Sequence, residues 1–229
     1  MSVAQRLNEV RSRIATAATA AGRDPGEVAL LAVSKTFPAP VVAEAVAAGQ
    51  RALGENRVQE ALEKQPLLAR EAGDLAWHLI GPLQRNKVRK VVGHFTCLQG
   101  IDSLKLARAV DRVAGELAVR QTILLQVKIG GEESKSGFEP ARLREEIDEL
   151  AALSHLQIDG LMTIPPPVEA AEEARPYFAR LRELRDALAV SSGLPLRELS
   201  MGMSNDYPAA IAEGATLVRV GSAIFGSRE

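Results

Sequence analysis

Val28-Ala-Leu-Leu-Ala-Val33, followed at once by Ser34-Lys35-Thr36, decides the fold of this chain. The first six residues are apolar throughout, which is typical of a parallel strand that is buried on both faces. A Rossmann-type sheet would continue from such a strand into a G-x-G-x-x-G turn, whereas this strand continues into Ser-Lys-Thr. The stretch therefore favours a different α/β fold, with Lys35 at the carboxyl end of its first strand.

The same alternation of apolar runs and helical patterns continues along the chain. A helical stretch ending at Gly49 follows the first strand. We expect seven further strands, near residues 51–54, 76–80, 94–99, 122–128, 156–161, 198–199 and 216–220, separated by helices at 57–68, 84–91, 103–118, 141–153, 169–190 and 208–213. Such a pattern leaves two architectures, a closed barrel or an open doubly wound sheet, and eight strands favour a (β/α)8 TIM barrel.

The residues before the first strand predict an additional N-terminal helix. Val3, Leu7, Val10 and Ile14 recur at helical spacing, which favours a packed amphipathic helix over a transit peptide. No segment has the composition of a linker, so we expect residues 1–229 to form a single domain.

Composition excludes several classes of function. The formal net charge of −1 gives no general attraction to nucleic acid or to anionic membranes. Cys97 is the only cysteine, so no intramolecular disulfide can form, and the three histidines lack metal-ligand spacing. No apolar stretch is long enough to span a membrane, and we expect a cytoplasmic protein without a metal.

Three segments carry candidate chemistry, and all of them follow strands. Burial at a strand end would favour the neutral amine of Lys35, which is the form that attacks an aldehyde to give a Schiff base. Ser200-Met-Gly-Met-Ser204 and Arg219-Val-Gly-Ser222 follow the seventh and eighth strands, where barrels of this kind usually bind phosphate. Taken alone, Lys35 could be a solvated lysine at a strand end, and each of the two loops could be an ordinary polar turn. Together they predict a site for a phosphorylated aldehyde.

Five motifs resemble the pyridoxal 5′-phosphate (PLP) homeostasis protein family, also called PLP-binding or proline synthetase co-transcribed proteins. They are Leu31-Ala-Val-Ser-Lys35-Thr, Gly54-Glu-Asn-Arg-Val-Gln-Glu60, Trp77-His-Leu-Ile-Gly-Pro-Leu-Gln84, Ser200-Met-Gly-Met-Ser204 and Arg219-Val-Gly-Ser-Ala-Ile-Phe-Gly226. The resemblance covers nearly the whole chain. It implies a barrel like the N-terminal domain of alanine racemase, with PLP held as a Schiff base.

The resemblance also implies roles for individual residues. Lys35 would carry the Schiff base, Arg219 would face the pyridine nitrogen, Asn56 would lie near the ring, and the loops at 200–204 and 221–222 would hold the phosphate. The complete expected cofactor-binding set is Lys35, Asn56, His78, Ser200, Gly202, Ser204, Arg219, Gly221 and Ser222. No catalytic residue is established by the resemblance.

The expected function is PLP binding for intracellular PLP homeostasis, in which the protein buffers PLP or delivers it to apoenzymes and affects the balance of amino and keto acids. An arginine cannot protonate the pyridine nitrogen, which makes PLP a poor electron sink. A racemase also needs a second acid or base, and the only tyrosines are Tyr177 and Tyr207. Of these, Tyr207 could lie near the mouth, although its expected role is packing. A low-activity PLP-dependent racemase and a Schiff-base aldolase without PLP are the alternatives. We expect a monomer.

Overall fold

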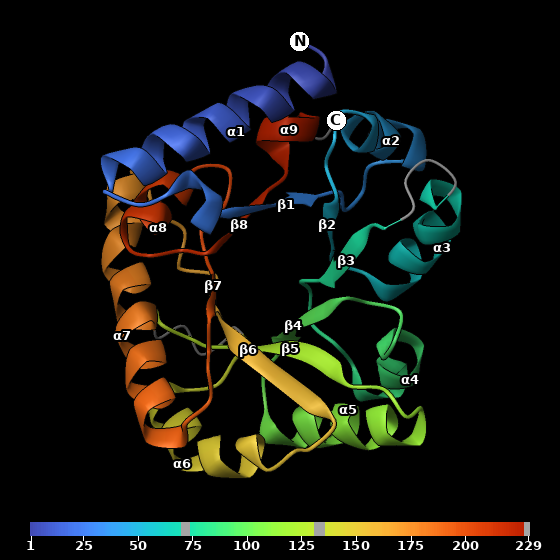
Figure 1. The fold of residues 1–229 in the computed structure, drawn as a ribbon, viewed down its shortest axis with the longest axis vertical. Helices are drawn as coiled ribbons and strands as arrows, with labels where there is room; N and C mark the ends of the chain where they lie inside the picture. Colours follow the sequence, from blue (N-terminus) through green and yellow to red (C-terminus); the bar gives the residue numbers. More distant parts are fainter. Residues whose placement is uncertain (70–73, 131–135, 227–229) are drawn as a thin grey trace.

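Eight parallel strands close into a barrel in sequence order, as the sequence predicts (Figure 1). The computed structural model describes residues 1–69, 74–130 and 136–226. The closing pair joins the last strand to the first, with Leu31 opposite Arg219. The strands are β1 (Ala29–Val33), β2 (Ala52–Glu55), β3 (Ala76–Leu79), β4 (Cys97–Ile101), β5 (Gln121–Gln126), β6 (Leu156–Met162), β7 (Glu198–Ser200) and β8 (Leu217–Val220).

The helices form a ring around the barrel (Figure 1). Their apolar faces and the outward faces of the strands form one large hydrophobic cluster. The helices are α1 (Val3–Ala20), α2 (Ala39–Ala47), α3 (Val58–Leu68), α4 (Val88–Val91), α5 (Leu104–Glu116), α6 (Pro140–Ala151), α7 (Arg175–Ser192), α8 (Tyr207–Ala212) and α9 (Ser222–Phe225). None of those in the described ranges is long and apolar enough to cross a membrane.

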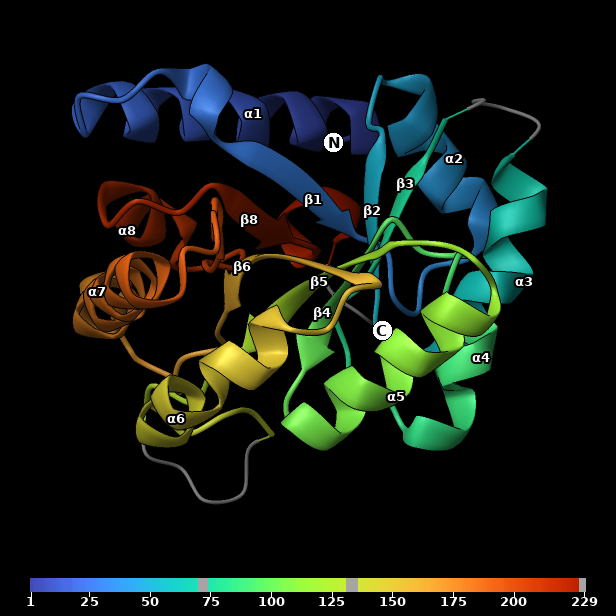
Figure 2. The ribbon, with the colours of Figure 1, turned by 60° about the horizontal axis from the view of Figure 1, so that its bottom comes forward.

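The N-terminal helix α1 has the buried face that its spacing predicts. Val3, Leu7, Val10 and Ile14 are all buried. Ser2 caps the helix in a capping box with Gln5, so the first turn satisfies its own backbone donors. Figure 2 shows α1 lying along the outside of the barrel, where it packs against α8, α9 and α2.

Three local predictions need correction. His94 and Phe95 lie outside β4, because Gly93 turns the chain with a φ of +79° and the strand begins only at Cys97. The predicted helix at 169–190 begins as a short 3-10 helix at Ala171–Ala174, and α7 follows from Arg175 to Ser192. The helical spacing of Tyr177, Leu181, Leu184 and Leu188 predicts that Tyr177 is on the buried face of this helix, but Phe178 is buried there instead and Tyr177 is half-buried. The short helix α9 has no counterpart among the predicted elements.

Candidate functional site

A cavity of about 700 Å³ opens at the carboxyl ends of the strands. Ligand sites usually lie in this size range, and this end of a barrel is where they form. Six of the nine residues expected to bind the cofactor line the cavity: Lys35, Asn56, Ser204, Arg219, Gly221 and Ser222. Phe37 and the segment Ile164–Glu169 complete much of its wall.

Lys35 lies between this cavity and a smaller one. The second cavity, of about 310 Å³, extends toward the end of β5 and shares five lining residues with the first: Lys35, Asn56, Ile80, Ile164 and Pro166. Lys35 is half-buried and follows the buried residues Val33 and Ser34. A side chain at this point can reach a ligand in either cavity.

The two loops expected to bind phosphate contact each other. Ser204 Oγ accepts a hydrogen bond of 3.3 Å from the Gly221 N–H, which leaves the hydroxyl hydrogen of Ser204 to donate elsewhere. Gly202 turns the first loop with a φ of +89°, and a Cβ there would lie 2.6 Å from Ala210 Cβ. Only glycine therefore allows this loop to pass so close to α8.

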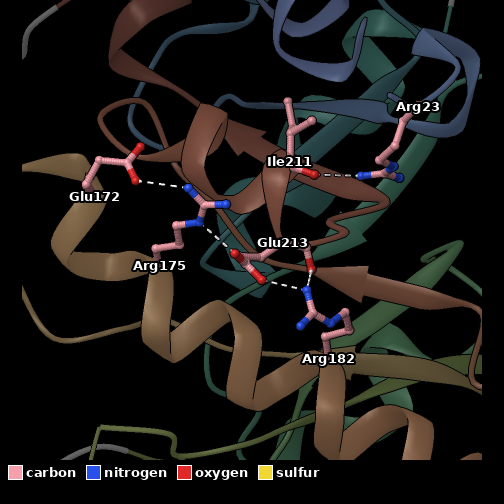
Figure 3. A network of polar contacts seen from close by, with 6 residues as sticks. All are labelled: Arg23, Glu172, Arg175, Arg182, Ile211 and Glu213. Carbon is pink, nitrogen blue, oxygen red and sulfur yellow. Dashed lines mark hydrogen bonds and ion pairs between the residues drawn. The ribbon is translucent and has the colours of Figure 1, made fainter. Parts of the chain in front are cut away.

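Ionic and polar contacts hold the carboxyl end of α8 (Figure 3). Glu213 accepts hydrogen bonds from Arg175 at 2.6 Å and Arg182 at 2.5 Å, both on α7. The bond from Arg175, with that from Arg182, lowers the pKa of Glu213. Arg23 donates to the Ile211 carbonyl at 2.9 Å, near the carboxyl end of α8. The helix that follows the Ser204 loop is thus fixed to α7 and to the turn after α1.

Arg219 is a buried cation in the wall of the cavity. Its Nη1 donates to the carbonyl and the hydroxyl of Ser200, both at 2.7 Å, and its Nη2 donates to the Thr163 carbonyl at 2.7 Å. No carboxylate in the described part of the chain forms an ion pair with it. Burial lowers its pKa to about 10, so it stays protonated at neutral pH. Asp206, also buried in the cavity wall, opposes that shift.

A chain of hydrogen bonds extends from Arg219 across the barrel to His78. Ser200 Oγ donates to Gln99 Oε1 at 2.7 Å, and Gln99 Nε2 lies 2.9 Å from His78 Nδ1. Because arginine only donates, every bond in the chain points away from Arg219, and His78 Nδ1 must accept. The proton of the neutral imidazole is therefore on Nε2. Burial lowers the pKa of His78 to about 4.

Three expected cofactor residues do not line the cavity. His78 and Ser200 belong to the hydrogen-bond chain behind its wall, and Gly202 packs against α8. Tyr207 is fully buried as well, with its ring 5.7 Å from the guanidinium carbon of Arg13 on α1. It takes the packing role expected of it and does not line the cavity.

Sequence reasoning missed several residues that shape the site. Gln99 and Thr163 hold Arg219 and its neighbours from inside the barrel. Asp206 accepts a hydrogen bond of 2.6 Å from the Met203 N–H, which fixes the turn after Ser204. The pattern Ser204-Asn-Asp206 before a helix is a capping signal that could have identified Asp206. Gln99 and Thr163 carry no such signal.

Comparison with known proteins gives consistent results. Residues 6–229 match the family model described as alanine racemase, N-terminal domain. The chain is 43% identical to the pyridoxal phosphate homeostasis protein of Aquifex aeolicus, with all of both chains covered. It is 46% identical to the protein of that name from Pseudomonas aeruginosa, covering 100% of this chain and 96% of that one. The structure of PipY from Synechococcus elongatus, solved with PLP bound, is 46% identical, with a TM-score of 0.88 over 98% of this chain and 100% of PipY.

Proposed function

Because the chain belongs to the pyridoxal phosphate homeostasis protein family, we propose that it binds PLP in the larger cavity and takes part in PLP homeostasis. The observation that carries this proposal is the meeting, in one cavity, of a strand-end lysine with two serine-bearing loops and a buried arginine. An amine, hydroxyl donors and a fixed cation are the groups that a phosphorylated aldehyde requires.

The residues present fit the cofactor. Gly221 lies in the cavity wall, where a Cβ would come within 3.1 Å of the Val33 carbonyl oxygen and crowd the end of β1. Because Gly221 has no Cβ, the backbone of the loop at 221–222 can lie against β1, with Ser222 beside it. The buried positive charge of Arg219, without an ion-pair partner in the described chain, favours an electron-rich ligand group in front of it.

We assign a separate task to each residue. Ser204 and Ser222 bind the phosphate, Arg219 faces the pyridine nitrogen, and Asn56 lies beside the ring. Lys35 supplies the amine. When bound, PLP supplies an aldehyde that condenses reversibly with an amine, releasing water, and that can be exchanged from one amine to another.

The proposed role is storage and delivery rather than catalysis. Arg219 donates through both of its terminal nitrogens to fixed acceptors and keeps its own proton, so it cannot protonate the ring nitrogen. Tyr207, which could have supplied an acid or base, points into the packing against α1. A slow amino-acid racemase is the alternative, and chiral analysis of alanine after long incubation with the PLP-loaded protein distinguishes them. Sustained racemisation that is lost in Lys35→Ala would favour the enzyme.

The test of PLP binding is a visible absorption spectrum, followed by borohydride reduction and peptide mass mapping. We expect a yellow protein that is bleached by borohydride and carries a pyridoxyl group on the Lys35 peptide. Lys35→Ala should still bind PLP weakly, through the phosphate contacts, without a reducible link. A wild-type protein that stays colourless with PLP, or a reducible link that persists in Lys35→Ala, would refute the assignment.

We further propose that residues 1–229 work as one PLP-binding domain and that the chain is a monomer. The single ring of helices and the continuous hydrophobic cluster support the first statement. Light scattering during gel filtration should give the mass of one chain, and the mass of a dimer would contradict the second.

A further inference from the structure

We propose that a clamp of the buried residues Glu55 and Lys64 and the partly buried Glu60 fixes the backbone on both sides of Lys35, so that Lys64 is a positioning residue for the lysine that binds PLP. This inference rests on the proposed function of Lys35. The clamp itself lies behind the cavity, and none of its three residues lines the wall.

The clamp holds Ser34, the residue before Lys35, by two contacts. Ser34 Oγ donates to Glu55 Oε1 at 2.7 Å, and the Ser34 carbonyl accepts from Lys64 Nζ at 2.8 Å. The side chains of Ser34 and Glu55 are fully buried. Together these contacts tie the hydroxyl of Ser34 to β2 and its carbonyl to α3.

The clamp also holds Thr36, the residue after Lys35. The Thr36 N–H donates to Glu60 Oε1 at 2.5 Å. Thr36 has a φ of +71°, in the left-handed region that residues with a branched Cβ rarely adopt. Such a conformation persists only when its surroundings impose it, and it is found most often at functional sites. Two hydrogen bonds hold this turn: the one from the Thr36 N–H to the Glu60 carboxylate, and one of 3.1 Å from the Phe37 N–H to the Ser34 carbonyl.

Lys64 joins the two halves. Its Nζ donates to Glu55 Oε1 at 2.8 Å, to Glu60 Oε1 at 2.7 Å and to the Ser34 carbonyl, which uses all three of its hydrogens. The side chain is 8% exposed. A single buried ammonium group therefore sets the positions of both carboxylates, and through them the residues on either side of Lys35.

The cost of this arrangement argues for a role beyond packing. Burying ions is expensive, and an apolar side chain of similar size usually stabilises a fold as well as a buried pair does. Burial raises the pKa of Glu55, whose Oε2 has no hydrogen-bond partner in the described chain. For Glu60, which is more exposed, burial is outweighed by the hydrogen bonds from Lys64 and Thr36, and its pKa is lowered. The three residues place two negative charges and one positive charge beside the residues that flank Lys35. Apolar side chains would be enough if these positions served only to pack the fold.

Comparing the affinities for two ligands distinguishes a change in the position of Lys35 from general damage to the cavity. PLP and pyridoxine 5′-phosphate share the ring and phosphate, but the second carries a hydroxymethyl group instead of the aldehyde and cannot bond to Lys35. In Lys64→Met we expect the affinity for PLP to fall about tenfold or more, while the affinity for pyridoxine 5′-phosphate changes less than twofold. Lys105→Met, which removes an exposed lysine on α5, is the matched control and should change neither.

A second variant keeps the test open if Lys64→Met does not fold. Glu60→Ala removes the acceptor of the Thr36 N–H and leaves the contact between Lys64 and Glu55 in place. It should also weaken PLP binding selectively. In the protein without PLP, the Thr36 amide should exchange its hydrogen at least tenfold faster in Glu60→Ala than in the wild type.

The outcomes are distinct. Selective loss of PLP affinity together with faster exchange at Thr36 supports the clamp. Equal loss for both ligands, or no loss for either, overturns it. If the wild-type protein forms no link through Lys35, the proposed function fails, and the exchange measurement still decides whether the clamp holds Thr36.

Discussion

Replacing His78 with asparagine should make the fold less sensitive to acid. His78 Nδ1 accepts from Gln99, and its imidazole stays neutral because burial lowers its pKa to about 4. Asparagine offers an acceptor oxygen near the position of Nδ1 and has no proton to gain. The variant thus keeps the hydrogen bond and removes the titration.

The sign and size follow from proton linkage. The unfolded chain protonates His78 below its ordinary pKa of 6.5, whereas the folded chain does so only near 4. The unfolded state therefore binds more protons between these values, and the free energy of unfolding falls as the pH falls from about 6.5 to 4. The pKa difference between 6.5 and about 4 corresponds to a loss of at most roughly 3 kcal/mol.

Urea unfolding at several pH values between 7.5 and 4 measures this loss. The free energies of wild type and His78→Asn should converge or cross as the pH falls, because only the wild type loses the contribution of His78. Carboxylates such as Glu55 and Glu60 titrate in both proteins and cancel in the difference. His94→Asn, at an exposed position, controls for the loss of a histidine as such. Parallel curves for wild type and His78→Asn would refute the argument.

Three further predictions concern the scaffold of the site. Gly202→Ala should lower the free energy of unfolding in urea by about 2 to 4 kcal/mol, because it adds a clash with α8 to an unfavourable φ. Gly193→Ala, at a φ of +69° with nothing within 4 Å, should lower it by about 1 kcal/mol. Equal losses in the two variants would contradict the reasoning. Burial raises the pKa of the Cys97 thiol, so a thiol reagent should label it only in denaturant, and rapid labelling of the native protein would disprove its burial. Glu213→Gln should speed amide hydrogen exchange in α8 and leave the exchange rates in α5 unchanged. Unchanged exchange in α8 would mean that the contacts in Figure 3 do not hold that helix.

The barrel itself could be predicted because its signals are repeated. Short apolar runs at regular intervals indicate parallel strands, and one amphipathic pattern predicted α1 with its buried face. The start of α7 could not be located in this way, since the 3-10 helix at Ala171–Ala174 has the same polar composition as a first helical turn. A helix as short as α9 has too few residues to show any periodicity.

Apart from Arg219, which lies in β8 and still reaches the cavity, most of the site residues that could be predicted follow a strand. Lys35, Asn56 and Ser204 lie beyond the last paired residues, so they reach the cavity. His78 and Ser200 lie within β3 and β7, and each residue of a strand adds about 3.3 Å of depth. Their side chains therefore lie inside the barrel, where both contact Gln99 and Ser200 also contacts Arg219, rather than line the cavity.

For Lys64, helical periodicity alone predicts part of its set of interior contacts. Val58, Ala61 and Leu68 define the buried face of α3, and helical spacing places Lys64 on that same face. A lysine there needs a partner, and Glu60, four residues earlier, is the partner that spacing suggests. Glu55 ends β2 and Ser34 directly follows β1, so Glu55 and Lys64 reach Ser34 only because β1 and β2 are neighbours in the barrel. Sequence patterns can therefore identify the buried Lys64 and its helical neighbour Glu60. Glu55 and Ser34, which connect Lys64 to Lys35, can be found only once the order of the strands is known.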